Sequence, residues 1–174
     1  PRHPQRFDEI AELISAADFK LLRRSRLDLD TLPPEQTADQ LAGCEVLLGD
    51  SMGEMFSYYA MADATIMGGS LLPFGGQNLI EACAAGSPVV LGPHTFNFDE
   101  ASTNAIESGA AVRVPDAEQA AHVAMALVND PATRARTAEC AMRFASEHRG
   151  ATARTLSLLN EVLERPERSG SGQH

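Results

Sequence analysis

Three glycine-bearing segments are the first candidates for binding a ligand. They are GDSMGE at 49–54, GGS at 68–70 and PFGGQN at 73–78. Because Gly75 and Gly76 have no Cβ, their backbone N–H groups can approach a ligand closely. A helix that begins just after them leaves its first N–H groups without internal partners and presents a positive dipole end, which favours an anion such as a phosphate. The pattern predicts an anion-binding turn.

Glu81 is the carboxylate closest to this turn. It follows Asn78 by three residues, so both side chains lie on the same face of the expected helix. A carboxylate in the first turn can complement the helix dipole, an effect of roughly a few tenths of a kcal/mol. It can also accept hydrogen bonds from the two hydroxyls of a ribose beside the phosphate. The helix alone leaves both roles open, and the two further glycine loops favour the ribose.

Other nucleotide and metal chemistries lack their usual residues. No G-x-G-x-x-G follows a strand, and the only lysine is Lys20, so neither the dinucleotide fingerprint nor a Walker-type ATPase is indicated. The five histidines lack metal-ligand spacing. We expect no metal and no other cofactor. The cysteines are odd in number and far apart, which indicates reduced thiols at Cys44, Cys83 and Cys140.

The order of elements predicts an α/β fold. Strands are expected at 19–22, 45–49, 64–67, 88–91 and 110–114, and helices at 5–17, 53–61, 77–85 and 97–108. The strands are continuous apolar runs, as in sheets buried on both faces. Alternating strands and helices predict a Rossmann-like parallel sheet with helices on both faces. Ligands of such sheets bind beyond the carboxyl ends of the strands, where all three glycine segments fall.

The remaining segments are helical or irregular. Residues 24–43 contain Pro33-Pro34 and predict a loop with at most a helical turn. Asp116 and Gln119 form a capping pair, and Asp130-Pro131 starts another helix with proline in its first position. The last helix has a narrow apolar stripe at Leu156, Leu159 and Leu163. We therefore expect a helical C-terminal extension, followed by a flexible tail at 165–174.

The composition restricts the class of protein. The 174 residues are 44% hydrophobic and 22% charged, as in one soluble globular domain, expected over 1–164. A net charge of −10 argues against nucleic-acid binding, which requires a basic face. No apolar run is long enough to span a membrane. The chain opens at PRHPQRF with a helical pattern and no strand before it, so we expect that an upstream part is missing.

Two stretches resemble a known family. PRHPQRF and the run from Gly49 to Phe98 are similar to the C-terminal half of the 3-deoxy-D-manno-octulosonic-acid (Kdo) transferases, and the resemblance extends over roughly residues 1–160. The glycine loop followed by a helix that bears Glu81 is shared with many two-domain glycosyltransferases of the GT-B type. This chain reads GGQNLIEA where many members have a GGHNPLEP-like run, so Gln77 and Ala82 depart from the pattern.

The resemblance implies an activity for a longer protein. That protein would transfer Kdo from CMP-Kdo to a lipid A precursor in lipopolysaccharide biosynthesis, with inversion and without a metal, at the cytoplasmic face of the bacterial inner membrane. An N-terminal domain, absent here, would bind the lipid acceptor and the membrane surface and carry the acidic base. We therefore expect no catalytic residue in this chain, which alone would be soluble and inactive.

The resemblance also implies a donor site. Arg2 would pair with the phosphate or carboxylate of the donor, residues 75–78 would wrap the phosphate, and Glu81 would hold the ribose. Asn97 would lie at the rim of the cleft between the domains. The complete expected set is Arg2, His3, Ser51, Met52, Gly53, Glu54, Gly69, Ser70, Gly75, Gly76, Gln77, Asn78, Glu81 and Asn97.

Several alternatives stay open. The chain can belong to another GT-B nucleotide-sugar enzyme, such as a UDP-sugar transferase or epimerase, or to a non-catalytic Rossmann-type binding domain. Individual residues also have purely structural interpretations. Gly53, Gly68 and Gly69 can serve as turn residues, Gly86 as the left-handed end of its helix, and Tyr58 and Tyr59 as packing residues.

Overall fold

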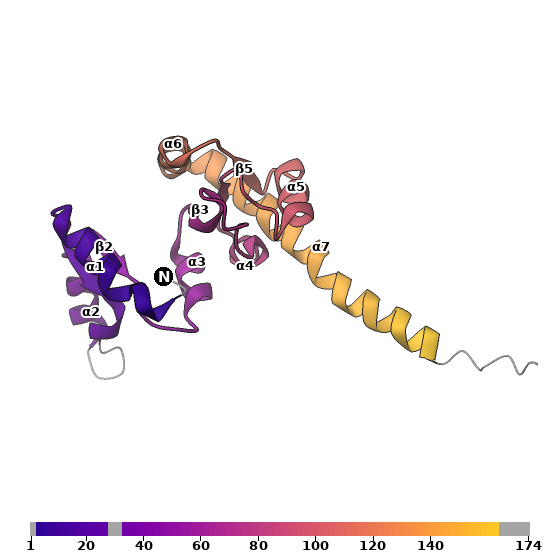
Figure 1. The fold of residues 1–174 in the computed structure, drawn as a ribbon, viewed down its shortest axis with the longest axis horizontal. Helices are drawn as coiled ribbons and strands as arrows, with labels where there is room; N and C mark the ends of the chain where they lie inside the picture. The colour runs from indigo at the N-terminus through magenta and orange to yellow at the C-terminus, as the bar shows by residue number, and fades with distance from the viewer. Residues whose placement is uncertain (1–2, 28–32, 164–174) are drawn as a thin grey trace, which may run out of the picture. The chain divides into compact units, whose positions relative to one another are not determined.

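The chain forms two compact units that meet between Met55 and Phe56. The structure, a computed structural model, describes residues 3–27 and 33–163 (Figure 1). Arg2 and the expected tail at 165–174 lie outside the described residues. The assignment of residues 1–164 to one nucleotide-sugar domain stays a prediction, and each unit is described here by itself.

The first unit contains a two-stranded parallel sheet. Its elements are η1 (Pro4–Arg6), α1 (Phe7–Ala16), β1 (Leu21–Arg23), η2 (Arg24–Arg26), α2 (Pro34–Ala42) and β2 (Val46–Leu48). Leu22 of β1 lies opposite Leu47 of β2. The nine-residue helix α2 corrects the expectation of at most a helical turn at 24–43. Pro34 does not break it, because proline at the first helical position loses an N–H that has no partner within the helix.

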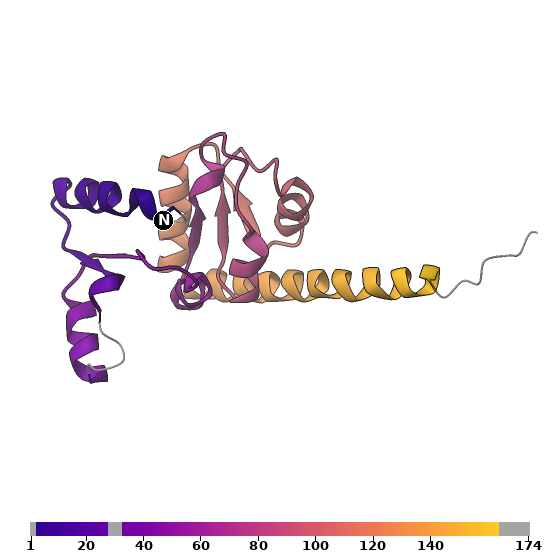
Figure 2. The same cartoon turned by 60° about the horizontal axis from the view of Figure 1, so that its bottom comes forward.

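The second unit is built on a three-stranded parallel sheet in the order β3–β4–β5. Figure 2 shows these strands running side by side with helices packed around them. The elements are α3 (Met55–Met61), β3 (Thr65–Met67), η3 (Gly68–Ser70), α4 (Leu79–Ala84), β4 (Val89–Leu91), α5 (Asp99–Glu107), β5 (Ala111–Arg113), α6 (Ala117–Asn129) and α7 (Pro131–Leu163). The predicted Rossmann-like α/β class is confirmed, although the strands are divided between two sheets.

Helices cover both faces of the second sheet, and alternate residues of β4 show how. Val89 and Leu91 pack in a cluster with residues of α4, α5 and α7, whereas Val90 packs in another with Ala120 and Leu127 of α6. Successive side chains of a strand point to opposite faces, so β4 is buried on both. All three of its residues are at most 1% exposed. Burial on both faces explains why the sequence of β4 is a continuous apolar run.

The larger cluster is rich in small side chains, which allow α4 and α7 to approach closely. Cys83 of α4 is fully buried there, and burial raises the pKa of its thiol to about 12. This agrees with the predicted reduced core thiol. Tyr59 is 8% exposed and belongs to the same cluster, as its packing interpretation requires. Gly86 has a φ of 79° just after α4, which confirms it as the left-handed end of that helix.

The C-terminal helices begin as the sequence predicts. Asp116 Oδ1 accepts a hydrogen bond from the Gln119 N–H at 2.8 Å, and Asp130 Oδ1 accepts from the Thr133 N–H at 3.0 Å. Pro131 is the first residue of α7, which continues for 33 residues. Among the described residues, no helix, α7 included, combines the length and apolar character needed to cross a membrane.

Candidate nucleotide-binding site

Two loops leave the carboxyl edge of the second sheet and meet there. One, residues 68–78, follows β3, and the other, residues 92–98, follows β4. The Gly76 N–H donates to the Gly69 carbonyl at 3.0 Å within the first loop, and the His94 N–H donates to the Ser70 carbonyl at 2.9 Å between the loops. The glycine segments of this unit therefore lie at the edge where ligands of parallel sheets bind.

Ser70 joins the first loop to the end of β4. Its side chain is fully buried, and its Oγ donates to the Met67 carbonyl at 2.5 Å and accepts from the Gly92 N–H at 2.7 Å. The expected donor-site role of Ser70 is thus indirect in this structure. Its hydroxyl supports the base of the loop and does not face a ligand.

The glycine turn at 75–76 has the backbone that only glycine adopts readily. Gly75 and Gly76 have φ values of 86° and 81°. A Cβ on Gly75 would lie 2.2 Å from Asn97 Nδ2. Asn97 stabilises this turn with two hydrogen bonds. Its N–H donates to the Gly75 carbonyl at 3.1 Å, and its Nδ2 donates to the Phe74 carbonyl at 3.2 Å. We expected Asn97 at a cleft rim, and in this unit it braces the glycine turn.

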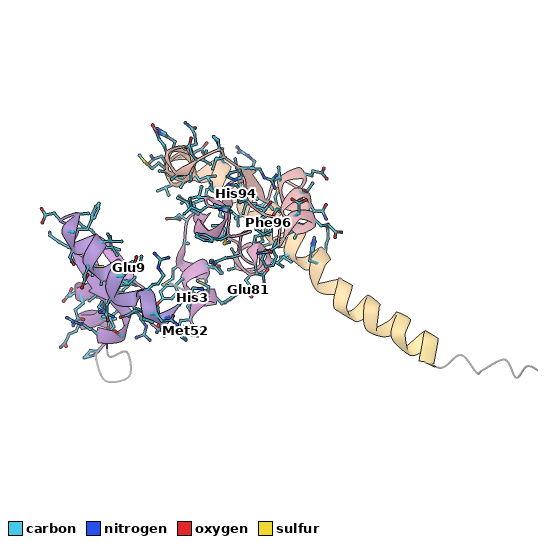
Figure 3. The ribbon with its side chains drawn as sticks, in the orientation of Figure 1. His3, Glu9, Met52, Glu81, His94 and Phe96 are labelled. Carbon is cyan, nitrogen blue, oxygen red and sulfur yellow. The ribbon has the colours of Figure 1, made fainter. Side chains whose placement is uncertain are left out.

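Glu81 is held in place at the start of α4 (Figure 3). Asn78 caps this helix, since its Oδ1 accepts from the Ile80 N–H at 3.1 Å, and its Nδ2 donates to Glu81 Oε1 at 2.9 Å. Glu81 itself is exposed. Helix α4 has only six residues and is shorter than the expected 77–85, so Gln77 and Asn78 belong to the turn. A helix this short has a smaller dipole than the expected helix, so the prediction of an anion site depends mainly on the amides of the turn.

The GDSMGE segment lies in the first unit, after β2. Glu54 Oε1 accepts from Arg24 Nη2 at 2.6 Å, and Glu54 Oε2 pairs with Ser51 Oγ. Met52 is 64% exposed, and Gly53 has a φ of 83° with open space around its Cα. His3 is exposed in the same unit (Figure 3). The sequence reasoning missed Arg24, whose signal was the basic run RRSR (23–26), which begins at the last residue of β1.

Asp50, in the same loop, is a buried and fully hydrogen-bonded carboxylate. Its side chain is 1% exposed, Arg23 Nε donates to Oδ2 at 2.6 Å, and the Ser25 N–H donates to Oδ1 at 2.7 Å. Burial by itself raises the pKa of Asp50, but hydrogen bonds from Ser25 and Arg23 outweigh burial and lower the pKa from 3.8 to about 2. Asp50 therefore fixes the loop after β2 as an anion.

We expect Asp50→Asn to lower the free energy of unfolding by about 2 kcal/mol at pH 7. Because the pKa is lower in the folded state, this stabilisation is complete above pH 3.8 and is lost as the pH falls toward about 2. Urea unfolding followed by circular dichroism at pH 7, 4 and 2.5 measures the difference between the two proteins. Asp8→Asn is the matched control, because Asp8 also pairs with Arg23 but its side chain is 83% exposed. An equal decrease in the free energy of unfolding for Asp50→Asn and Asp8→Asn would contradict the prediction.

The expected site residues thus fall into two groups. The second unit brings together Gly69, Ser70, Gly75, Gly76, Gln77, Asn78, Glu81 and Asn97. The first unit holds His3, Ser51, Met52, Gly53 and Glu54, and Arg2 lies outside the described residues. A parallel sheet with helices on both faces and glycine turns at its carboxyl edge defines a Rossmann-like α/β domain.

Comparisons with known proteins agree with this class. The family model described as "Glycosyl transferases group 1" matches residues 36–144. The 3-deoxy-D-manno-octulosonic acid transferase of Bordetella pertussis is 50% identical to this chain, over 94% of this chain and 36% of the relative. The 3-deoxy-D-manno-octulosonic acid transferase of Haemophilus influenzae is 39% identical, over 95% of this chain and 36% of the relative. The chain therefore spans about a third of these relatives.

A solved structure of a related domain is also similar to this chain. The C-terminal CMP-Kdo binding domain of WaaA from Acinetobacter baumannii matches with a TM-score of 0.72 and 32% identity, over 83% of this chain and 70% of that one. The chain belongs to the group 1 glycosyltransferases and, within them, to the Kdo transferase family.

Proposed function

We propose that this chain is the donor-binding half of a Kdo transferase and that it binds CMP-Kdo at the carboxyl edge of the β3–β4–β5 sheet. The observation that carries the proposal is the left-handed turn at Gly75 and Gly76, with Glu81 held by Asn78 in the first turn of the next helix. The Gly76 N–H already donates to the Gly69 carbonyl, so the other backbone N–H groups of residues 75–78 would bind the phosphate, and the carboxylate would accept hydrogen bonds from ribose hydroxyls. The solved structural neighbour is a CMP-Kdo binding domain, which supports this ligand.

The chemistry of this donor suits such a site. CMP-Kdo carries a phosphodiester and a sugar carboxylate, and it must bind to a chain of net charge −10. Backbone amides can hold anionic groups without adding formal charge. In the first unit, Arg24 compensates the charge of Glu54 in the GDSMGE loop, because its Nη2 lies 2.6 Å from Glu54 Oε1.

In the proposed reaction, a hydroxyl of a lipid A precursor attacks the anomeric carbon of Kdo from the face opposite CMP. The bond from that carbon to the phosphate oxygen breaks, CMP leaves with the bonding electrons, and a base outside this chain takes the hydroxyl proton. Transfer inverts the anomeric centre and requires no metal. Amides of the glycine turn would stabilise the growing charge on CMP, and one such donor typically lowers a barrier by ~3 kcal/mol. Because the acceptor is a membrane lipid, the longer protein would act at the cytoplasmic face of the inner membrane.

Calorimetric titration of the 174-residue chain with CMP, UMP and ADP tests the donor class. We expect CMP to bind at least about tenfold more tightly than UMP or ADP, a difference of about 1.4 kcal/mol. A preference for UMP would instead support a UDP-sugar enzyme of the same architecture. A folded chain that binds none of the three would support a non-catalytic domain.

A further inference from the structure

Arg113, at the end of β5, makes an unusual contact at the same sheet edge. Its Nη2 donates to Thr95 Oγ1 at 2.9 Å, across 18 residues of sequence. Thr95 is 3% exposed, whereas Arg113 is exposed. An exposed guanidinium thus reaches inward to the hydroxyl of a buried residue in the loop that follows β4.

The backbone of Thr95 packs against the glycine turn. A Cβ on Gly76 would lie 3.5 Å from Thr95 Cα and 3.5 Å from the His94 carbonyl oxygen, so this loop is in van der Waals contact with the turn. Asn97, two residues further on, holds the Gly75 carbonyl. Residues 94–98 therefore form a brace, and we use that name for them below.

Further hydrogen bonds anchor the brace on its other side. Within the brace, the Phe98 N–H donates to the Thr95 carbonyl at 2.7 Å, and toward α5, Thr95 Oγ1 donates to Asp99 Oδ1 at 3.5 Å. Arg113 adds the link to the neighbouring strand. The brace is thus fixed between β5, the start of α5 and the glycine turn.

The position of Arg113 also distinguishes it from the other cations of its unit. Within residues 56–163, every other arginine belongs to α7, and there is no lysine. No salt bridge found in the described part of the chain involves Arg113. Its observed partner is therefore the neutral hydroxyl of Thr95, a contact that fixes geometry rather than neutralising a charge.

We propose that Arg113 is a positioning residue for the phosphate-binding turn and acts through Thr95. The inference rests on the proposed function and adds to it a residue outside both glycine segments. By holding Thr95, Arg113 would keep the brace against Gly76 and preserve the backbone conformation of the turn, and with it the direction of the N–H groups that do not donate within the protein. Its loss would weaken binding of the phosphate and leave binding of the nucleoside unchanged.

Titrations of the full chain with CMP and with cytidine test this proposal. We expect Arg113→Ala to weaken CMP binding about tenfold, with cytidine affinity unchanged. Thr95→Val should have a similar effect, and the double variant should lose no more than either single variant, because both remove one interaction. Arg113→Lys, which keeps a cationic donor, should recover part of the CMP affinity.

Arg136→Ala is the matched control, because Arg136 Nη2 also donates to a threonine hydroxyl, that of Thr133, at 2.7 Å, but on the exposed surface of α7. It should bind CMP like the wild type. If the wild type binds CMP and Arg113→Ala binds it equally well, the inference is wrong while the proposed function stands. Additive losses in the double variant, or equal losses for CMP and cytidine, would also overturn it. A folded wild type that does not bind CMP would overturn the proposed function, and this inference with it.

Discussion

Glu81→Ala is expected to weaken CMP binding about 30-fold while the melting temperature stays within about 2 °C of the wild type. In the proposed site, the Glu81 carboxylate accepts hydrogen bonds from two ribose hydroxyls. Loss of a charged acceptor typically costs about 2 kcal/mol of binding free energy, which corresponds to a factor of about 30 in affinity. Glu81 is exposed and its observed partner is the side chain of Asn78, so folding depends on it little. Calorimetry with CMP and thermal unfolding of the same samples measure both quantities.

Two further variants separate the ribose role from a helix-capping role. Glu81→Gln keeps one acceptor oxygen and should fall between the wild type and Glu81→Ala. Glu118→Ala removes an exposed carboxylate from the first turn of another helix, α6, and should leave CMP binding unchanged. A Glu81→Ala protein that binds CMP normally but unfolds at a lower temperature would show that the carboxylate serves only the helix.

The sequence allowed the order of elements to be predicted because each element has its own local signal. The apolar run at 88–91 contains β4, and the capping residues Asp116 and Asp130 start α6 and α7. Local signals were weakest where local and tertiary preferences differ. Pro33-Pro34 indicated a break, yet α2 begins at Pro34. The division of the strands into two sheets depends on which strands pair, and that has no local signal.

The candidate site was predictable in its backbone and in the pair Asn78 and Glu81, whose residues are close in sequence. Gly75 and Gly76 could be identified from the sequence as a turn, although a glycine pair alone does not fix a left-handed backbone, because Gly68 and Gly69 have no positive φ and belong to η3. The side chains that hold the turn could not be, because their partners are distant in sequence. Asn97 lies 23 residues from Phe74, and Arg113 lies 18 residues from Thr95. Such contacts follow from the packing of β4 beside its neighbours and not from any motif.

Gly92→Ala is expected to lower the free energy of unfolding by about 3 kcal/mol. A Cβ at this position would lie 2.3 Å from the Ser70 carbonyl oxygen and 2.7 Å from Leu71 Cα, and these backbone atoms cannot yield by changing rotamer. The loop after β3 would have to move away from β4, which breaks the buried hydrogen bond from the Gly92 N–H to Ser70 Oγ. Thermal unfolding should show a decrease of about 10 °C.

Gly68→Ala provides the control, because Gly68 begins the loop 68–78 that Gly92 contacts from the neighbouring loop. No atom lies within 4 Å of a Cβ on Gly68, and its φ is not positive, so the variant should unfold within about 2 °C of the wild type. Because the displaced loop carries the glycine turn, Gly92→Ala should also bind CMP more weakly than Gly68→Ala. If both variants unfold at the wild-type temperature, the close contact between Gly92 and Ser70 does not hold this loop on the sheet, and the geometry proposed for the phosphate is wrong.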